Sequence, residues 1–438
     1  MNPWLAILLV LGALAALLGG LAVLGRRGRI SPEASRKTVH VVLGCITLSF
    51  PWLFTRLWPV WVLAALAVGT LAALRWLRPV ASADRRVLLG VTRESYGELC
   101  FPLAVALVFT CSRAHPAHYL LAVAALTFAD AAGALIGGRF GRLRFTTDEG
   151  LKTVEGSLAI WLITSLLTFC ILLVADDADI GRAALVAALI GVLTALLEAI
   201  ALKGFDNLFL PLLVWSLVTK YAELTAPQLG VRLAALLLIV AGAVIWRNGT
   251  RLNHAGMLGA ALLIYLCAVL GDWRWVLHPL VAAACYLWLC RHDQDTVSVP
   301  HTLAAAFAVA GPGLFWLFMQ QTGVWPASFA CFATAFAVEM ALMTFTETWD
   351  PVTPPRHARA WLLAVATGAG LGLLAGAVCW LDALQGLRAA GVLLLACAAA
   401  VTMFHALEWS RATAHQHDAR WLLQGGLGIA ASLLGVWI

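Results

Sequence analysis

The chain has 438 residues, of which 62% are apolar and only 12% are charged, and its formal net charge is +6. Soluble domains carry about 25% charged residues, so this composition excludes an ordinary soluble enzyme. Hydrocarbon leaves backbone groups without water, so such a chain must form helices or a closed barrel. Because the apolar runs are long and do not alternate, the sequence predicts an all-α, polytopic transmembrane helical bundle.

The predicted elements are apolar runs of about 20 residues, the length that a spanning helix needs. They are separated by short breaks that contain Arg, Asp, Gly or Pro. By that criterion the chain has about sixteen helices, which begin near Trp4, Val39, Leu57, Gly97, His118, Ser157, Gly181, Leu208, Gly230, His254, Val276, His301, Pro326, Ala360, Leu387 and Trp421. The first run has no cleavage site and is followed by arginines, which is typical of an uncleaved helix.

The basic residues give an orientation, because cytoplasmic loops are enriched in Lys and Arg. If the N-terminus is outside, all but seven of the 29 basic residues fall on the cytoplasmic side. The seven exceptions are Arg56, Arg113, Arg182, Lys220, Arg232, Arg274 and Arg388. We therefore expect a multi-pass protein of a bacterial inner membrane. Basic loops beside anionic lipid account for the net charge, so no nucleic-acid partner is needed.

Polar residues on this predicted inner face gather in clusters, and charged groups inside spans are costly and usually functional. The first cluster contains Arg36, Lys37 and His40. Two cations and an imidazole at the edge of a helix can hold a polyphosphate. The Arg-Lys pair alone is equally typical of an interfacial anchor.

The second cluster begins at Asp130, nine residues before Arg139 and hence about 13 Å along the helix axis from it. A carboxylate at that depth needs a cation or a polar cavity. The glycines that follow recur every four residues, at Gly133, Gly137 and Gly141, which permits either a ligand or another helix to approach closely. The next loop contains the sequence Lys152-Thr-Val-Glu155-Gly156-Ser157.

The third cluster contains Glu198 and, after Lys203-Gly204, Asp206 and Asn207. We predict that Asp130, Glu155, Glu198 and Asp206 meet as a set, because Mg²⁺ takes hard oxygen ligands and nucleotide phosphates. The alternative for Glu198 is an ion pair with a basic neighbour such as Lys203. A fourth cluster, the loop from Arg85-Arg86 to Glu98, contains Arg93-Glu-Ser-Tyr96-Gly-Glu98 and is also explained by a helix cap with paired charges.

Taken together, these motifs resemble the CTP-dependent lipid-alcohol kinases, a family of dolichol, phytol and farnesol kinases and the CTP-using diacylglycerol kinase. The resemblance covers roughly residues 30–222 and rests on Arg36-Lys37 with His40, Asp130 with Gly137 and the Gly138-Arg-Phe-Gly141 run, Lys152 to Ser157, and Asp206-Asn207. It implies a kinase-like membrane domain at residues 1–229. Residues 230–438 would form a second helical membrane domain whose role is not assigned.

The resemblance also implies an activity: transfer of the γ-phosphoryl group of CTP to the hydroxyl of a lipid alcohol, a prenol or diacylglycerol, at the cytoplasmic face. Asp130, Lys152, Glu155 and Asp206 would be catalytic. Asp130, Glu155, Glu198 and Asp206 would hold Mg²⁺. The nucleotide would be bound by Arg36, Lys37, His40, Gly133, Gly137, Arg139, Lys152, Gly156, Ser157 and Asn207.

Two alternatives remain. The segment from Asp130 to Gly156 is also similar to phosphatidate cytidylyltransferase, but that enzyme's later signature is missing where Lys203 to Pro211 stands, so we favour the kinase. A lipid or ion transporter would use Asp130, Glu198 and Glu339 as ion-binding residues. An inverted repeat that relates the two halves would favour the transporter. No such repeat is seen, because the second cluster has no counterpart after Gly230.

Overall fold

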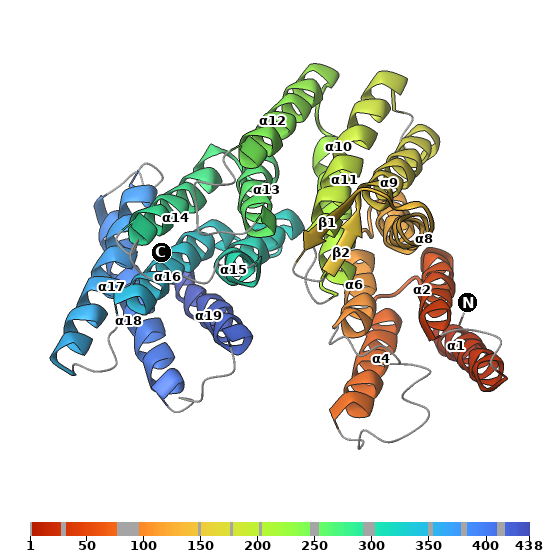
Figure 1. The fold of residues 1–438 in the computed structure, drawn as a ribbon, viewed down its shortest axis with the longest axis horizontal. Helices are drawn as coiled ribbons and strands as arrows, with labels where there is room; N and C mark the ends of the chain where they lie inside the picture. The colour runs from red at the N-terminus through yellow and green to blue at the C-terminus, as the bar shows by residue number, and fades with distance from the viewer. Residues whose placement is uncertain are drawn as a thin grey trace. The chain divides into compact units, whose positions relative to one another are not determined.

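The computed structural model describes residues 2–27, 32–76, 96–147, 150–175, 178–200, 204–245, 254–291, 303–348, 354–377, 383–409 and 417–438. Nearly all of them lie in helices, which confirms the predicted all-α polytopic membrane bundle (Figure 1). The chain forms two compact units, Met1–Leu233 and Ala234–Ile438. The boundary lies within a helix, close to the predicted domain boundary at residue 229.

The first unit contains most of the polar clusters. Its elements are α1 (Pro3–Arg26), α2 (Pro32–Leu48), α3 (Phe50–Leu53), α4 (Trp58–Trp76), α6 (Gly97–Cys111), α7 (Pro116–Ala124), η1 (Ala125–Ala129), α8 (Asp130–Phe140), β1 (Arg144–Thr147), β2 (Gly150–Thr153), α9 (Val154–Ala175), α10 (Ile180–Ala199) and α11 (Asp206–Tyr221). Helix α12 (Ala226–Ile245) contains the boundary between the units.

The second unit consists of α13 (His254–Leu270), α14 (Trp273–Arg291), α15 (Leu303–Thr322), α16 (Ser328–Thr348), α17 (Pro354–Gly376), α18 (Ala383–Trp409), α19 (His417–Ser432) and η2 (Leu433–Trp437). Across both units, helices begin at or within a few residues of the predicted positions. The largest differences are α2 and α17, which begin earlier, at Pro32 and Pro354.

Several helices are suited to crossing a membrane. Seven helical segments in the described part of the chain are long and apolar enough to do so: Pro3–Gly25, Pro116–Phe140, Val154–Ala175, Ile180–Ala199, Ser328–Thr348, His357–Gly376 and Leu384–Leu407. Shorter apolar helices span Trp58–Ala73, Gly97–Cys111, Ala226–Gly242 and Ala255–Leu270. The protein is therefore a multi-pass membrane protein.

The span Pro116–Phe140 is a single helical run with an unusual turn in its middle. Proline at its start suits a helix terminus, where the missing amide would have no partner. The run is α-helical in α7, becomes a π-helix in η1, and returns to α-helix at Asp130. A π turn is rare and is often found at functional sites, and here it immediately precedes Asp130.

A short antiparallel hairpin, which the sequence did not predict, joins α8 to α9. Gly141 ends α8 in an extended conformation, and the strands pair Arg144 with Thr153 and Phe145 with Lys152. Thr153 then caps α9, because its Oγ1 accepts a hydrogen bond from the amide of Gly156 at 3.2 Å. The hairpin therefore fixes the position of Lys152 relative to α9.

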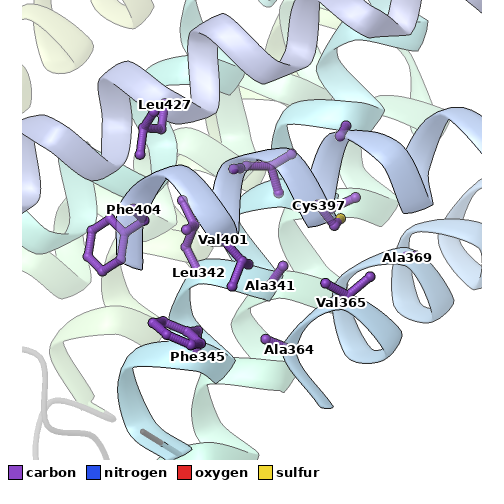
Figure 2. Close-up of a cluster of buried hydrophobic side chains, with 14 of the residues drawn as sticks. Ala341, Leu342, Phe345, Ala364, Val365, Ala369, Cys397, Val401, Phe404 and Leu427 are labelled. Carbon is purple, nitrogen blue, oxygen red and sulfur yellow. The ribbon is translucent and has the colours of Figure 1, made fainter. Parts of the chain in front are cut away.

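In the second unit, α16 is the central helix and contacts α14, α15, α17, α18 and α19. Every residue from Cys331 to Phe345 is buried. Figure 2 shows part of this core, where side chains of α16, α17 and α18 such as Phe345, Val365 and Phe404 point toward one another. Between helices that span a membrane, close van der Waals packing of this kind stabilises the bundle.

The core of the second unit also holds one carboxylate, Glu339, which is fully buried in α16. Its Oε2 accepts a hydrogen bond from Nε2 of Gln424 in α19 at 2.8 Å. Glu339 therefore has one polar partner on a second helix, while its Oε1 is buried without a hydrogen-bond partner among the described residues. Its ion-binding role in the transporter alternative stays a prediction.

Candidate active site

Three carboxylates that are far apart in the sequence meet in the first unit. Asp130 begins α8, Glu198 lies in the last turn of α10, and Asp206 begins α11. One carboxylate oxygen of each lies within 4.8 Å of those of the other two, and all three residues are half-buried. The structure thus brings together three of the four carboxylates that were predicted to form a set. We call Asp130, Glu198 and Asp206 the carboxylate group.

The turn that places Asp206 beside Glu198 depends on glycine. Gly204 has φ = 84°, a left-handed conformation that a Cβ atom disfavours. The chain then enters α11 at once, with the amide of Asn207 donating to the carbonyl of Gly204 at 3.3 Å. Asp206 is thereby held at the N-terminus of α11, where the helix dipole favours a negative charge.

Lys152 of the hairpin provides a positive charge at the carboxylate group. Its Nζ lies 3.1 Å from Oε1 of Glu198 and also donates to the backbone carbonyl of the same residue. The side chains of Lys152 and Glu198 are 22% and 14% exposed, so water screens this ion pair less than one at the surface. The predicted alternative partner, Lys203, lies outside the described residues.

His40 reaches the group from α2. Its Nε2 lies 3.4 Å from Oδ2 of Asp130 and 3.2 Å from the backbone carbonyl oxygen of Leu126. The ring of Phe101 in α6 meets the imidazole edge-on, with the two ring centroids 5.4 Å apart. The structure therefore places His40 against a carboxylate and a carbonyl, both of which are hydrogen-bond acceptors.

The charges in this group favour a bound cation. Burial raises the pKa of Asp206, and the Asp130 carboxylate raises it further, whereas Lys152 lowers it. Oε2 of Glu198 and Oδ1 of Asn207 are buried without a hydrogen-bond partner, which costs free energy that coordination to a cation would offset. Mg²⁺ takes hard oxygen ligands at about 2.0–2.1 Å. The carboxylate group supplies three such oxygens within 4.8 Å of one another, so its donor set suits this ion.

Glu155, the fourth carboxylate of the predicted set, is engaged elsewhere. Its Oε1 accepts hydrogen bonds from the backbone amides of Arg142 and Leu143 at 2.9 and 3.1 Å. These amides begin the connection from α8 to β1, so Glu155 ties the first turn of α9 to the hairpin. This geometry favours a structural role for Glu155 over the predicted role of metal ligand.

The glycines predicted to admit the nucleotide lie instead where α8 and α9 touch. A Cβ on Gly137 would lie 2.7 Å from Oγ1 of Thr153, and one on Gly156 would lie 2.9 Å from the carbonyl of Gly133. A Cβ on Gly133 would meet Ile160 of α9 at 2.5 Å. The face formed by these glycines is therefore occupied by a neighbouring helix, and the geometry favours helix packing.

The remaining predicted nucleotide-binding residues lie in α2, α8 and α9. Arg36 and Lys37 precede His40 by about one turn of α2, so they share a face with it. Arg139 is exposed near the end of α8, with its guanidinium carbon 5.5 Å from the ring centroid of Phe140. Ser157 is half-buried in the first turn of α9.

Aromatic residues beside the group were not predicted as site residues. The ring of Tyr96 lies 5.9 Å from that of Phe205, the residue directly before Asp206. The guanidinium group of Arg75 lies over the Tyr96 ring, with its central carbon 4.5 Å from the ring centroid. The sequence feature that could have revealed this aromatic pair is Phe205, which stands directly before Asp206 at the start of α11. Of the fourth cluster, Gly97 and Glu98 lie in the first turn of α6, and Arg85 to Ser95 lie outside the described residues.

Comparison with known proteins gives one informative similarity. No protein-family profile matches the chain, and no solved structure matches it. A stretch of 211 residues is 28% identical to the phytol kinase of Synechocystis sp., and the alignment covers 48% of this chain and 88% of that protein. Over about half of its length, this membrane protein is therefore similar to a phytol kinase.

Proposed function

We propose that this protein is a membrane kinase that transfers the γ-phosphoryl group of CTP to the hydroxyl of a lipid alcohol of the prenol type. The observation that carries the proposal is the carboxylate group, with Lys152 bound to Glu198, in a chain similar to a phytol kinase. Phosphoryl transfer depends mainly on positioning and on neutralising charge. Oxygen ligands and a lysine at one place are suited to that chemistry.

The residues of the site would divide the binding of the nucleotide between them. Asp130, Glu198 and Asp206 would hold Mg²⁺, which neutralises phosphate charge when it is bound. Lys152 has three donors, of which two are used by Glu198, so one is left for a phosphate oxygen. Arg36 and Lys37 would bind the phosphates further from the carboxylates.

In the proposed reaction, the lipid hydroxyl oxygen forms a bond to the γ-phosphorus of CTP. The bond between that phosphorus and the oxygen bridging to the β-phosphate breaks, and CDP leaves. The hydroxyl proton passes to a carboxylate of the group. The distribution of basic residues would place this site at the cytoplasmic face of a bacterial inner membrane, where CTP is available and the alcohol arrives laterally from the bilayer.

The test is a transfer assay with the purified full-length protein in lipid nanodiscs. We expect label from γ-labelled CTP to appear on phytol, farnesol, dolichol or diacylglycerol in the presence of Mg²⁺. Asp130→Asn should lower the rate by at least about 100-fold, as loss of a charge-stabilising group does. Glu223→Gln is the matched control, because Glu223 is 68% exposed and forms a surface ion pair with Lys220.

Two results would contradict the proposal. Transfer of CMP from α-labelled CTP to phosphatidate would assign the protein to the cytidylyltransferases instead. Absence of label on all four alcohols, together with ion-driven uptake into vesicles that is lost on Glu339→Gln, would favour the transporter.

A further inference from the structure

The π turn η1 receives a side-chain hydrogen bond from another helix beside Asp130. A π turn closes its hydrogen bonds across five residues instead of the four of an α-helix, and such turns are often found at functional sites. The carbonyl of Leu126, within η1, lies 3.2 Å from Nε2 of His40. A side chain from another helix therefore supplies a donor to the irregular turn.

The same nitrogen also faces the carboxylate group. His40 Nε2 is 3.4 Å from Oδ2 of Asp130. A carbonyl oxygen can only accept, so the hydrogen bond to Leu126 requires the proton on Nε2, and Oδ2 of Asp130 lies within ion-pair distance of the same N–H. A donor fixed by a backbone carbonyl on one side can orient the carboxylate on the other, as residues behind metal ligands commonly do.

The position of His40 is itself fixed by the way α2 packs. Gly44, one turn further along α2, lies so close to the side chain of Thr127 in η1 that a Cβ could not be accommodated without movement. Another turn on, the carbonyl of Thr47 accepts a hydrogen bond of 2.7 Å from the hydroxyl of Tyr119 in α7. His40, Gly44 and Thr47 thus lie along one face of α2, which is held against the α7–η1 run at three points.

We propose that His40 is a positioning residue for Asp130 and not a ligand of the nucleotide: it donates from Nε2 to both η1 and Asp130, and so directs this carboxylate toward Glu198 and Asp206. The part that His40 plays in catalysis rests on the proposed function. It also links two parts of the site, because Arg36 and Lys37 lie on the same helix one turn before His40. A shift of α2 would move these cations and the orientation of Asp130 together.

Three substitutions of His40 separate donor position from packing. His40→Gln places an amide nitrogen where Nε2 stands, whereas His40→Asn carries the same amide one methylene too short to reach. His40→Phe keeps a ring against Phe101 without a donor. We expect the Asn and Phe variants to weaken binding of Mn²⁺ alone, measured by titration of the full-length protein without nucleotide, by about 10–100-fold. The Gln variant should stay within about threefold of the native protein.

Kinetics give a second, independent readout. In the transfer assay, the Asn and Phe variants should lower kcat and raise the Mg²⁺ concentration needed for half-maximal rate, with little change in KM for CTP. Lys37→Ala should raise KM for CTP, with little change in kcat or in the Mg²⁺ concentration for half-maximal rate. The inference is overturned if Asn and Gln behave alike, if His40→Phe changes only KM for CTP, or if the native protein binds no Mn²⁺. Binding of Mn²⁺ that depends on His40 without any phosphoryl transfer would refute the proposed function but not this inference.

Discussion

Nζ of Lys152 lies 3.1 Å from Oε1 of Glu198, and Lys152 also donates to the backbone carbonyl of that residue. These contacts join the hairpin between α8 and α9 to the end of α10, next to Asp130 and Asp206. One lysine thus both links two segments of the chain and supplies positive charge where three carboxylates converge.

Removing this lysine should affect catalysis strongly. We expect Lys152→Met to lower the rate of phosphoryl transfer by at least about 100-fold, because the proposed donor to the reacting phosphate and a charge among the carboxylates are both lost. The measurement is the initial rate with labelled CTP. Lys220→Met is the control, since Lys220 pairs with the exposed Glu223 at 3.6 Å. A Lys152→Met rate above about a tenth of the native rate would contradict this role.

The carboxylates should separate into two classes in a Mg²⁺ titration. Glu198→Gln and Asp206→Asn should raise the Mg²⁺ concentration for half-maximal activity by about tenfold or more. Glu155→Ala should leave it unchanged and lower the melting temperature, because the amides of Arg142 and Leu143 lose their acceptor. If Glu155→Ala shifts the Mg²⁺ dependence as Glu198→Gln does, then Glu155 is a metal ligand after all.

Two adjacent glycines of α8 should respond differently to the same substitution. Gly137→Ala forces a Cβ to 2.7 Å from Oγ1 of Thr153 and should destabilise the protein by about 1–3 kcal/mol. Gly138→Ala meets nothing within 4 Å and should be neutral or stabilising by up to about 1 kcal/mol, because alanine favours helix. Thermal unfolding in nanodiscs measures both. A rise in KM for CTP without loss of stability in Gly137→Ala would favour a nucleotide-binding face.

The first unit should support activity without the second. The unit boundary lies inside α12 (Ala226–Ile245), so a truncation should follow Ile245 and not residue 229, which would cut that helix. We expect residues 1–245 to retain phosphoryl transfer, since the carboxylate group, Lys152 and His40 all lie in the first unit. The rate per folded molecule, compared with the full-length chain, is the measurement. Complete loss in a truncated protein that is folded by circular dichroism would show that the second unit contributes to the reaction.

Helices and their approximate starts could be predicted because each apolar run is long enough to span a membrane, and only helices satisfy the backbone there. The meeting of Asp130, Glu198 and Asp206 could be predicted because each is a costly charge near the same predicted face. These inferences needed only hydrophobicity and the position of charges along the chain.

Other features could not be predicted because they depend on contacts between distant segments. The π turn η1 has an ordinary apolar sequence. The side chain that contacts its Leu126 carbonyl belongs to His40, 86 residues away in the sequence. Glu155 differs from Asp130, Glu198 and Asp206 in that it accepts hydrogen bonds from the backbone amides of a neighbouring connection, which the sequence does not reveal. The stripe of Gly133 and Gly137 is equally compatible with a ligand or a helix, and only the position of α9 decides between them.

The hairpin that carries Lys152 makes the surrounding lipid part of the site's environment. A two-stranded hairpin is marginally stable by itself, and its flanking and outer residues Leu143 and Leu151 are 65% and 66% exposed. The hairpin belongs to a basic loop of the predicted cytoplasmic side, so these leucines would rest against the headgroup boundary of a bilayer, and detergent would replace that contact with a looser one. The position of Lys152, and with it the measured turnover, should therefore vary with the membrane mimetic chosen for purification, which makes loss of activity in micelles a poor criterion for a damaged protein.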